Sequence, residues 1–275
     1  MKPTIRMLLL PLAFCLAGGA YAQDKQDVQD LLRAAVDSSL RTPAFVARDA
    51  ARHPYETLRF FEVEPDMTVL EISPGGGWYT EILAPYLRER GTYIAAVYDG
   101  NSQVERYQRY AKMFEDKRAS HPVYDKVKVN FFEPPNRLKL AEPGTVDRVL
   151  TFRNVHNWLA YSEETALEML RNIYDSLKPG GYLGLVEHRL PVERLQDATA
   201  SSGYVHEEYV IRLAEQAGFK LAARSEINAN PKDTADHPGG VWALPPSYRN
   251  GDADRAKYEA MGESDRMTLR FVKPH

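Results

Sequence analysis

Residues 71–77 combine an acidic side chain with a glycine-rich turn, a pattern that suits a ligand site. An apolar run at 69–73 predicts a strand, and it ends in Pro-Gly-Gly-Gly just before a stretch with helical spacing. Gly75 and Gly77 allow the backbone to approach a ligand closely and to take positive φ. In open α/β sheets, ligands bind at the carboxyl ends of the strands. The turn therefore predicts a ligand site, the alternative being that its glycines serve only the turn.

Acidic residues near the expected strand ends indicate what kind of ligand this is. Asp99 ends the second expected strand and Glu133 the third, and a carboxylate there can accept hydrogen bonds from ribose hydroxyls. Glu71, next to the glycine turn, favours a cationic ligand. S-adenosylmethionine (SAM) matches, because it carries sulfonium and ammonium groups. The alternatives are that Glu71 caps the following helix, that Asp99 is an ordinary solvated strand end, and that Glu133 belongs only to a turn.

Two other nucleotide sites fit this turn less well. The dinucleotide fingerprint G-x-G-x-x-G fails because Thr80 occupies the position of its third glycine, which disfavours nicotinamide-dependent oxidoreduction. The Gly-Lys-Ser/Thr sequence of a phosphate-binding P-loop is absent from the chain.

Two histidines follow later strands and are candidate catalytic bases. His156 comes after the strand expected at 146–152, and His188 follows the next strand. A histidine near neutral pH can accept a substrate proton. The alternative is that His156, with Asn154, simply lines or packs the pocket, and His188 has the same ambiguity. We expect no metal site, because no histidine pair or histidine–carboxylate cluster stands at helical ligand spacing.

The chain between these candidate residues alternates apolar runs with helical patterns. Such alternation predicts an α/β fold with a mostly parallel sheet covered on both faces. Strands are expected at 69–73, 93–98, 127–132, 146–152, 182–187, 219–227 and 267–272, and helices at 79–90, 102–118, 163–177 and 207–217.

A long segment at 228–264 interrupts the pattern before the last strand. It is rich in proline and glycine, with one short helix expected at 254–261. A loop of this length inside a compact domain usually serves as a lid or a binding loop. Trp242, Tyr248 and Arg249 are its candidates for closing over a substrate.

Arg48 and Arg52 lie on one face of a helix expected before the first strand. A charged helix face is by default solvated. The alternative is that one of these arginines holds a carboxylate of the cofactor or the substrate.

Four stretches of the chain resemble motifs of the class I SAM-dependent methyltransferases: residues 69–77, 146–156, 177–183 and 217–219. The stretches 52–58 and 262–267 look like a group of exported bacterial methyltransferases in particular. The chain departs from the family where Ser73 replaces the usual first glycine and Pro74, which lacks a backbone donor, replaces a small residue.

The resemblance implies a Rossmann-like, doubly wound sheet of seven mostly parallel strands, with the last strand antiparallel. It implies SAM as the cofactor and direct methyl transfer to a small-molecule acceptor that the motifs do not name. The residues that would hold the cofactor are Glu71, Ser73, Gly75, Gly77, Asp99, Glu133 and Asn154. His156 or His188 would be the base.

Residues 1–22 predict a secretory signal peptide. Two basic residues flank the start, an apolar run follows at 7–17, and residues 20–22 (Ala-Tyr-Ala) supply a small-x-small cleavage site. The run is shorter than the roughly 20 apolar residues that a membrane-spanning helix needs. Cleavage would leave residues 23–275 as a single methyltransferase-like domain in the periplasm or outside the cell. A retained N-terminal anchor is the alternative.

The balance of charged residues limits the kinds of binding partner that we expect. The chain has 35 Lys and Arg against 38 Asp and Glu, with no long basic block, so we expect no nucleic-acid partner. We expect a small-molecule substrate and no membrane span in the mature chain, and no pattern indicates an oligomeric state. Because SAM is made in the cytoplasm, a second hypothesis stands beside methyl transfer: an exported, non-catalytic ligand-binding protein that retains the fold.

Overall fold

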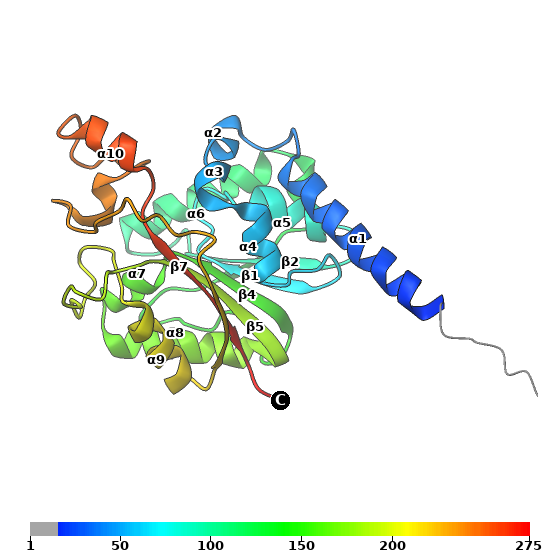
Figure 1. Cartoon of the computed structure of the whole chain (residues 1–275). Coiled ribbons are helices and arrows are strands. Elements are labelled where there is room, and N and C mark those ends of the chain that lie inside the picture. Colours follow the sequence, from blue (N-terminus) through cyan, green and yellow to red (C-terminus); the bar gives the residue numbers. More distant parts are fainter. Residues whose placement is uncertain (1–15) are drawn as a thin grey trace, which may run out of the picture.

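The computed structural model of the chain describes residues 16–275, with side chains from residue 26 onward (Figure 1). Most of the predicted signal peptide, residues 1–15, lies outside the described residues. The first helix, α1 (Leu16–Val36), runs through the predicted cleavage point after Ala22. Within the described part, no helix is long and apolar enough to span a membrane.

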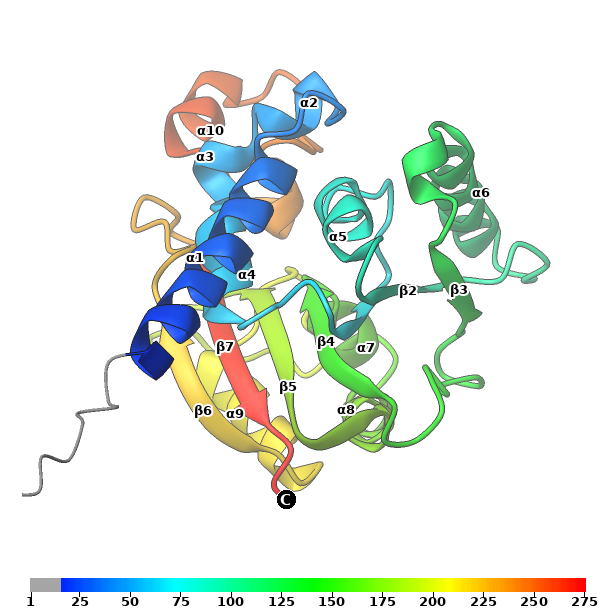
Figure 2. The ribbon, with the colours of Figure 1, turned by 90° about the vertical axis from the view of Figure 1, so that its right-hand side faces the viewer.

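Seven strands form one sheet in the order β3-β2-β1-β4-β5-β7-β6 (Figure 2). Neighbouring strands are parallel from β3 to β5, whereas β7 runs antiparallel to both β5 and β6. This confirms the predicted doubly wound sheet with an antiparallel last strand. The strands are β1 (Thr68–Ile72), β2 (Thr92–Val97), β3 (Lys128–Phe131), β4 (Val146–Phe152), β5 (Leu177–His188), β6 (Lys220–Ser225) and β7 (Arg266–Val272).

Helices cover both faces of the sheet with separate apolar clusters. On one face lie α1, α4 (Pro54–Phe60) and α5 (Thr80–Leu87), and on the other lie α8 (Glu163–Ser176) and α9 (Glu207–Gln216). The remaining helices and 3₁₀ turns are α2 (Pro43–Val46), α3 (Asp49–Arg52), α6 (Glu105–Ala119), η1 (Pro122–Tyr124), α7 (Val155–Leu159), η2 (Gly240–Ala243) and α10 (Arg255–Met261).

Alternation along β1 decides which way its side chains point. Val69 belongs to the cluster under α5, whereas Leu70 and Ile72 belong to the cluster on the opposite face. Successive side chains of a strand point to opposite faces. Glu71 therefore shares the α5 face with Val69 and is buried there.

The fifth strand begins earlier than predicted. Residues 178–181, expected to form a turn before the strand, are an irregularity inside β5. Val146 of β4 pairs with Leu177 of β5, and the next pair is Arg148 with Tyr182, so β5 has extra residues between these two pairs. A Cβ at Gly181 would lie 2.9 Å from the carbonyl oxygen of Lys178, so glycine suits this close approach.

Residues 228–264, called the insert below, are not a free loop. The short helix expected in the insert is present as α10. The insert is held by the buried carboxylate of Asp233, which accepts a hydrogen bond from Tyr204 Oη at 2.9 Å and from the backbone N–H of Asp265 at 2.8 Å. The same carboxylate lies 2.7 Å from His237 Nε2. These bonds anchor the insert beside the carboxyl ends of the strands, where Figures 1 and 2 also show α2 and α3.

Candidate functional site

A cavity of about 440 Å³ opens at the carboxyl ends of the central strands. This volume lies in the range of small-molecule sites. Its walls come from the turn after β1, the segment after β4, α2 with α3, the insert, α6, the ends of β2 and β5, and Pro134 after β3. The residues that matter below are Arg48, Arg52, Ser73, Gly75, Tyr98, Arg106, Arg153, Asn154, His156, His188, Trp242 and Glu263.

The glycine turn after β1 contributes two of the residues predicted to hold the cofactor. Ser73 and Gly75 line the cavity, with φ of 52° and 58°. A Cβ placed on Gly75 would meet no atom within 4 Å, so this position is open to the cavity. Gly77 does not line it, because a Cβ there would lie 2.7 Å from Lys117 Cγ. Gly77 thus serves packing against α6.

Glu71 lies beneath the turn and not along the cavity wall. Its Oε2 accepts a hydrogen bond from Tyr93 Oη at 2.6 Å, and that hydroxyl also contacts Thr80 Oγ1 at 2.8 Å. Burial raises the pKa of Glu71 to about 7. Glu71 thus does not line the cavity, because the alternation of β1 places its carboxylate on the α5 face, and its part in attracting a cationic ligand stays a prediction.

The two other predicted acids also lie outside the cavity lining. Asp99 accepts hydrogen bonds from the backbone N–H of Asn101 and from Arg137 Nη1, which together hold the pKa of Asp99 below its ordinary value. Glu133 Oε1 accepts a hydrogen bond from Ser102 Oγ at 2.9 Å. Their chain neighbours Tyr98 and Pro134 do line the cavity, so each acid stands one residue from its edge.

Asn154 lines the cavity and is held in one orientation. Its side-chain nitrogen donates to the carbonyl of Ile72 at 3.0 Å and to Thr151 Oγ1 at 3.1 Å. This amide ties the segment after β4 to the end of β1. Asn154 thus lines the cavity, although both of these hydrogen bonds are to other protein groups. Its contact with a cofactor stays a prediction.

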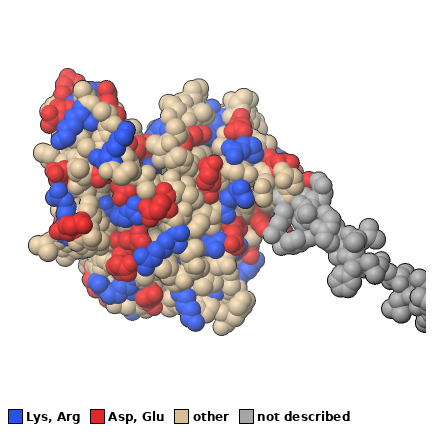
Figure 3. Space-filling view, in the orientation of Figure 1, with Lys and Arg blue, Asp and Glu red and all other residues tan. Residues whose placement is uncertain are grey.

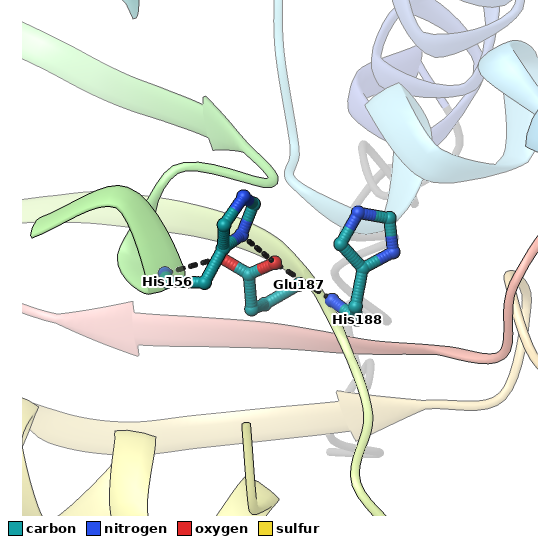
Figure 4. Close-up of side chains that lie close together, drawn as sticks. All are labelled: His156, Glu187 and His188. Carbon is teal, nitrogen blue, oxygen red and sulfur yellow. Dashed lines mark hydrogen bonds and ion pairs between the residues drawn. The ribbon is translucent and has the colours of Figure 1, made fainter. Parts of the chain in front are cut away.

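The two candidate catalytic histidines meet at the cavity with a residue that sequence reasoning missed (Figure 4). The carboxylate of Glu187 is fully buried and accepts backbone hydrogen bonds from His156 and His188. Because this carboxylate acts as an acceptor, the Nδ1 of His156, 3.0 Å away, is the donor. The second ring nitrogen of His156 then carries the lone pair, and in Figure 4 it points away from Glu187.

His188 differs from His156 in its surroundings. Its Nδ1 lies 2.6 Å from Ser264 Oγ. Burial lowers the pKa of His188 well below its ordinary value, and the neighbouring His156, Arg153 and Arg266 lower it further. His188 is therefore neutral at physiological pH and a poor proton acceptor.

His156, Glu187 and His188 also form a potential metal-ligand set. Each offers a ligand atom, and these atoms lie within 4.8 Å of one another. Two imidazoles and a carboxylate suit zinc or iron. Helical spacing could not indicate this group, because His156 lies in α7 whereas Glu187 and His188 are the last two residues of β5. The positive charges of Arg153 and Arg266, which lower the pKa of His188, would also repel a divalent cation bound to this group.

The pre-core arginines are not a solvated face. Arg52 is 4% exposed, and Arg52 Nε lies 3.2 Å from Glu263 Oε2. Arg48 Nε lies 2.7 Å from the other oxygen of the same carboxylate, and Arg266 Nη1 lies 3.3 Å from Oε2. Glu263 thus joins α3, the end of the insert and β7. The default expectation of a solvated helix face is wrong because this acid, far away in the sequence, draws the arginines inward.

Of the three insert residues expected to close over a substrate, Trp242 lines the cavity. Its ring lies 5.9 Å from the ring of His156, centre to centre. Tyr248 and Arg249 are outside the cavity lining, and the Arg249 guanidinium stacks 4.3 Å from the Trp242 ring.

Comparisons with known proteins support the fold. No protein-family model and no curated protein matches the sequence. Among solved structures, a SAM-dependent methyltransferase from Aquifex aeolicus is 16% identical, with a TM-score of 0.55 over 89% of this chain and 98% of that one. The [4+2]-cyclase SpnF is 15% identical, with a TM-score of 0.58 over 92% and 96%. At these identities the likeness concerns architecture, and the chain has the fold of the class I SAM-dependent methyltransferases.

Proposed function

We propose that the chain is a SAM-dependent methyltransferase acting on a small-molecule acceptor. The observation that carries this proposal is the cavity at the glycine turn after β1, at the carboxyl ends of the central strands. Ligands bind in this place in open α/β sheets. The position of the cavity in this particular fold favours SAM over other nucleotide ligands.

The residues around the cavity fit the parts of SAM. Gly75 leaves room for a ligand against the backbone. The Tyr98 ring, stacked on Tyr107 with centroids 3.9 Å apart, offers a flat apolar wall for a base. The Nη2 of Arg52 is buried without a hydrogen-bond partner among the described residues, and it suits a carboxylate. When bound, SAM supplies an electrophilic methyl group on its sulfonium sulfur.

His156 is the base in this proposal, and Glu187 is its positioning residue. The Nδ1–H of His156 bonded to Glu187 leaves the lone pair on the other ring nitrogen, which can accept the acceptor's proton as methyl transfer proceeds. Glu187 fixes the ring orientation and stabilises the imidazolium that results, as buried carboxylates do in other histidine dyads. The cavity walls hold the acceptor atom in line with the methyl group and sulfur of SAM, which lowers the entropic part of the barrier to methyl transfer.

Calorimetric titration with SAM and S-adenosylhomocysteine (SAH) tests the cofactor assignment. Wild-type protein is expected to bind both. Replacing Gly75 with arginine should weaken binding at least about 100-fold, because the new side chain would enter the cavity.

Gly144 offers a matched control for this replacement. It also has positive φ, 67° against 58° for Gly75, and also has no atom within 4 Å of a built Cβ, but it lies outside the cavity lining. A side chain at either position costs about 1–2 kcal/mol of strain, so Gly144→Arg should bind SAH like wild type. Equal affinities for the Gly75 and Gly144 variants would refute the pocket assignment.

We further propose that the protein is exported after cleavage behind Ala22. Cleavage would shorten α1 but keep its buried residues Leu32, Ala35 and Val36. N-terminal sequencing of the protein from a bacterial periplasmic fraction should start at Gln23. A chain that starts at Met1 in the cytoplasm would contradict export.

A further inference from the structure

The cavity is strongly cationic, although the face of the molecule in Figure 3 is not. On the face in Figure 3, basic and acidic side chains are interspersed. Inside the cavity, four arginines (Arg48, Arg52, Arg106 and Arg153) stand against one carboxylate, Glu263. That carboxylate is already bonded to Arg48, Arg52 and Arg266. The Nη2 atoms of Arg48 and Arg52 are buried and have no hydrogen-bond partner among the described residues.

Among the arginines of the cavity, Arg153 has the most hydrogen-bond donors free to bind a ligand. It directly follows β4, with φ of 63°, and its backbone N–H donates to the carbonyl of Val186 at 2.7 Å. Within residues 26–275 its guanidinium takes part in no hydrogen bond or salt bridge that the structure records. Burial and the charge of Arg266 lower the pKa of Arg153 to about 10 and outweigh the nearby carboxylates of Glu263 and Glu187, which raise it.

Arg153 and Arg52 share a second, smaller space. With Arg266 they line a recess of about 10 Å³ behind the main cavity, which is roughly the room of one water. Burial and the Arg153 charge lower the pKa of Arg52 to about 9. The positive charges of Arg52, Arg153 and Arg266 around this recess repel one another, and this repulsion destabilises the protein unless an anion lies near them.

SAM does not supply the negative charge that would balance the arginines of the cavity. It carries a sulfonium, an ammonium and one carboxylate, so its net charge is positive, and its binding leaves the cavity more cationic than before. We infer that the methyl acceptor is an anion, with a carboxylate or similar oxyanion that binds Arg153 beside Arg52. This inference rests on the proposed function, because the charge argument counts SAM as the first ligand.

The cavity also has aromatic side chains in its lining. Phe152 precedes Arg153 in the chain, and Trp158 and Trp242 also line the cavity. An apolar, flat carbon skeleton would pack on these rings. Benzoate is therefore a suitable probe, and benzamide is its neutral counterpart of nearly the same shape.

Calorimetric titration of benzoate and benzamide into the full chain, with and without saturating SAH, tests the inference. Benzoate should bind at least about tenfold more tightly than benzamide, because a charge-assisted hydrogen bond contributes that much. Arg153→Gln should remove this preference, Arg153→Lys should keep part of it, and SAH affinity should change less than about twofold in both variants. Arg212→Gln removes the same charge from α9, outside the cavity lining, and should bind benzoate like wild type.

Two results would overturn the inference. One is equal or undetectable binding of benzoate and benzamide by wild-type protein at millimolar concentration. The other is a loss of SAH affinity in Arg153→Gln with unchanged affinity for 5′-methylthioadenosine, which lacks the amino-acid group, because Arg153 would then hold the cofactor's carboxylate. Failure of the proposed function is distinguishable: SAH would not bind at all, while the preference for benzoate persists in SAH-free protein.

Discussion

Replacing Glu263 with glutamine should lower the free energy of unfolding by about 3–5 kcal/mol, the usual cost of removing one partner of a buried ion pair. The carboxylate of Glu263 is shared by Arg48 and Arg52, at the two ends of α3, and by Arg266 of β7. A glutamine would leave two buried guanidinium groups and one half-buried one without a counter-charge. Urea unfolding followed by circular dichroism measures the difference.

Glu259→Gln is the matched control in the same part of the chain. Glu259 lies on α10 and pairs with Arg255 at 3.0 Å, with both side chains largely exposed. Exposed pairs contribute at most about 1 kcal/mol, so this variant should unfold nearly like wild type. Similar losses in the two variants would contradict the role given to Glu263.

The same residue should give the protein an acid-sensitive component of stability. Burial alone would raise the pKa of Glu263, but Arg52, Arg48 and Arg266 outweigh it and hold the pKa at about 2, below the ordinary 4.5. A carboxyl whose pKa is lower in the folded chain stabilises the fold above the unfolded pKa and loses this contribution as pH falls through the folded one. Between about 4.5 and 2, wild type should therefore lose more stability than Glu263→Gln.

Replacing His156 with glutamine should lower the rate of methyl transfer about 10²- to 10⁴-fold, the range that general bases contribute. SAH affinity should remain near the wild-type value, because the proton transfer of His156 affects the reaction and not cofactor binding. The measurement is SAH formation from SAM with the dialysable fraction of a bacterial extract as the source of acceptor. An unchanged rate would exclude His156 as the base.

Two companion variants separate chemistry from structure. Glu187→Gln should reduce the rate less than His156→Gln does, because it disturbs the orientation of the ring but keeps the base. His121→Gln should leave the rate unchanged, since His121 is exposed and outside the cavity lining.

Local patterns predicted the fold well because its strands are set by short apolar runs. The run at 146–152 matches β4 at both ends. The fifth strand was predicted too short, since proline and glycine at 178–181 are typical of a turn. In the folded chain, the backbone there bulges out of the ladder and β5 continues.

The site was predicted less completely because side-chain direction and long-range partners are not local properties. Ser73, Gly75, Asn154, His156 and His188 do line one cavity. Glu71 was expected there too, but the alternation of β1 turns it under α5. Glu187 and Glu263 meet their partners only through the fold, at separations that no periodicity reveals. A buried acid directly before His188, within an apolar strand, was the one signal available for Glu187.

The position of β7 inside the sheet affects when the chain can fold. This strand follows β6 in the sequence, yet it lies between β5 and β6 and pairs with both. β6 therefore cannot join the sheet until residues 266–272 have been synthesised and have paired with β5. Contacts between segments so distant in sequence form slowly. The insert joins β6 to β7, so the walls that it gives the cavity take their places only in this late step.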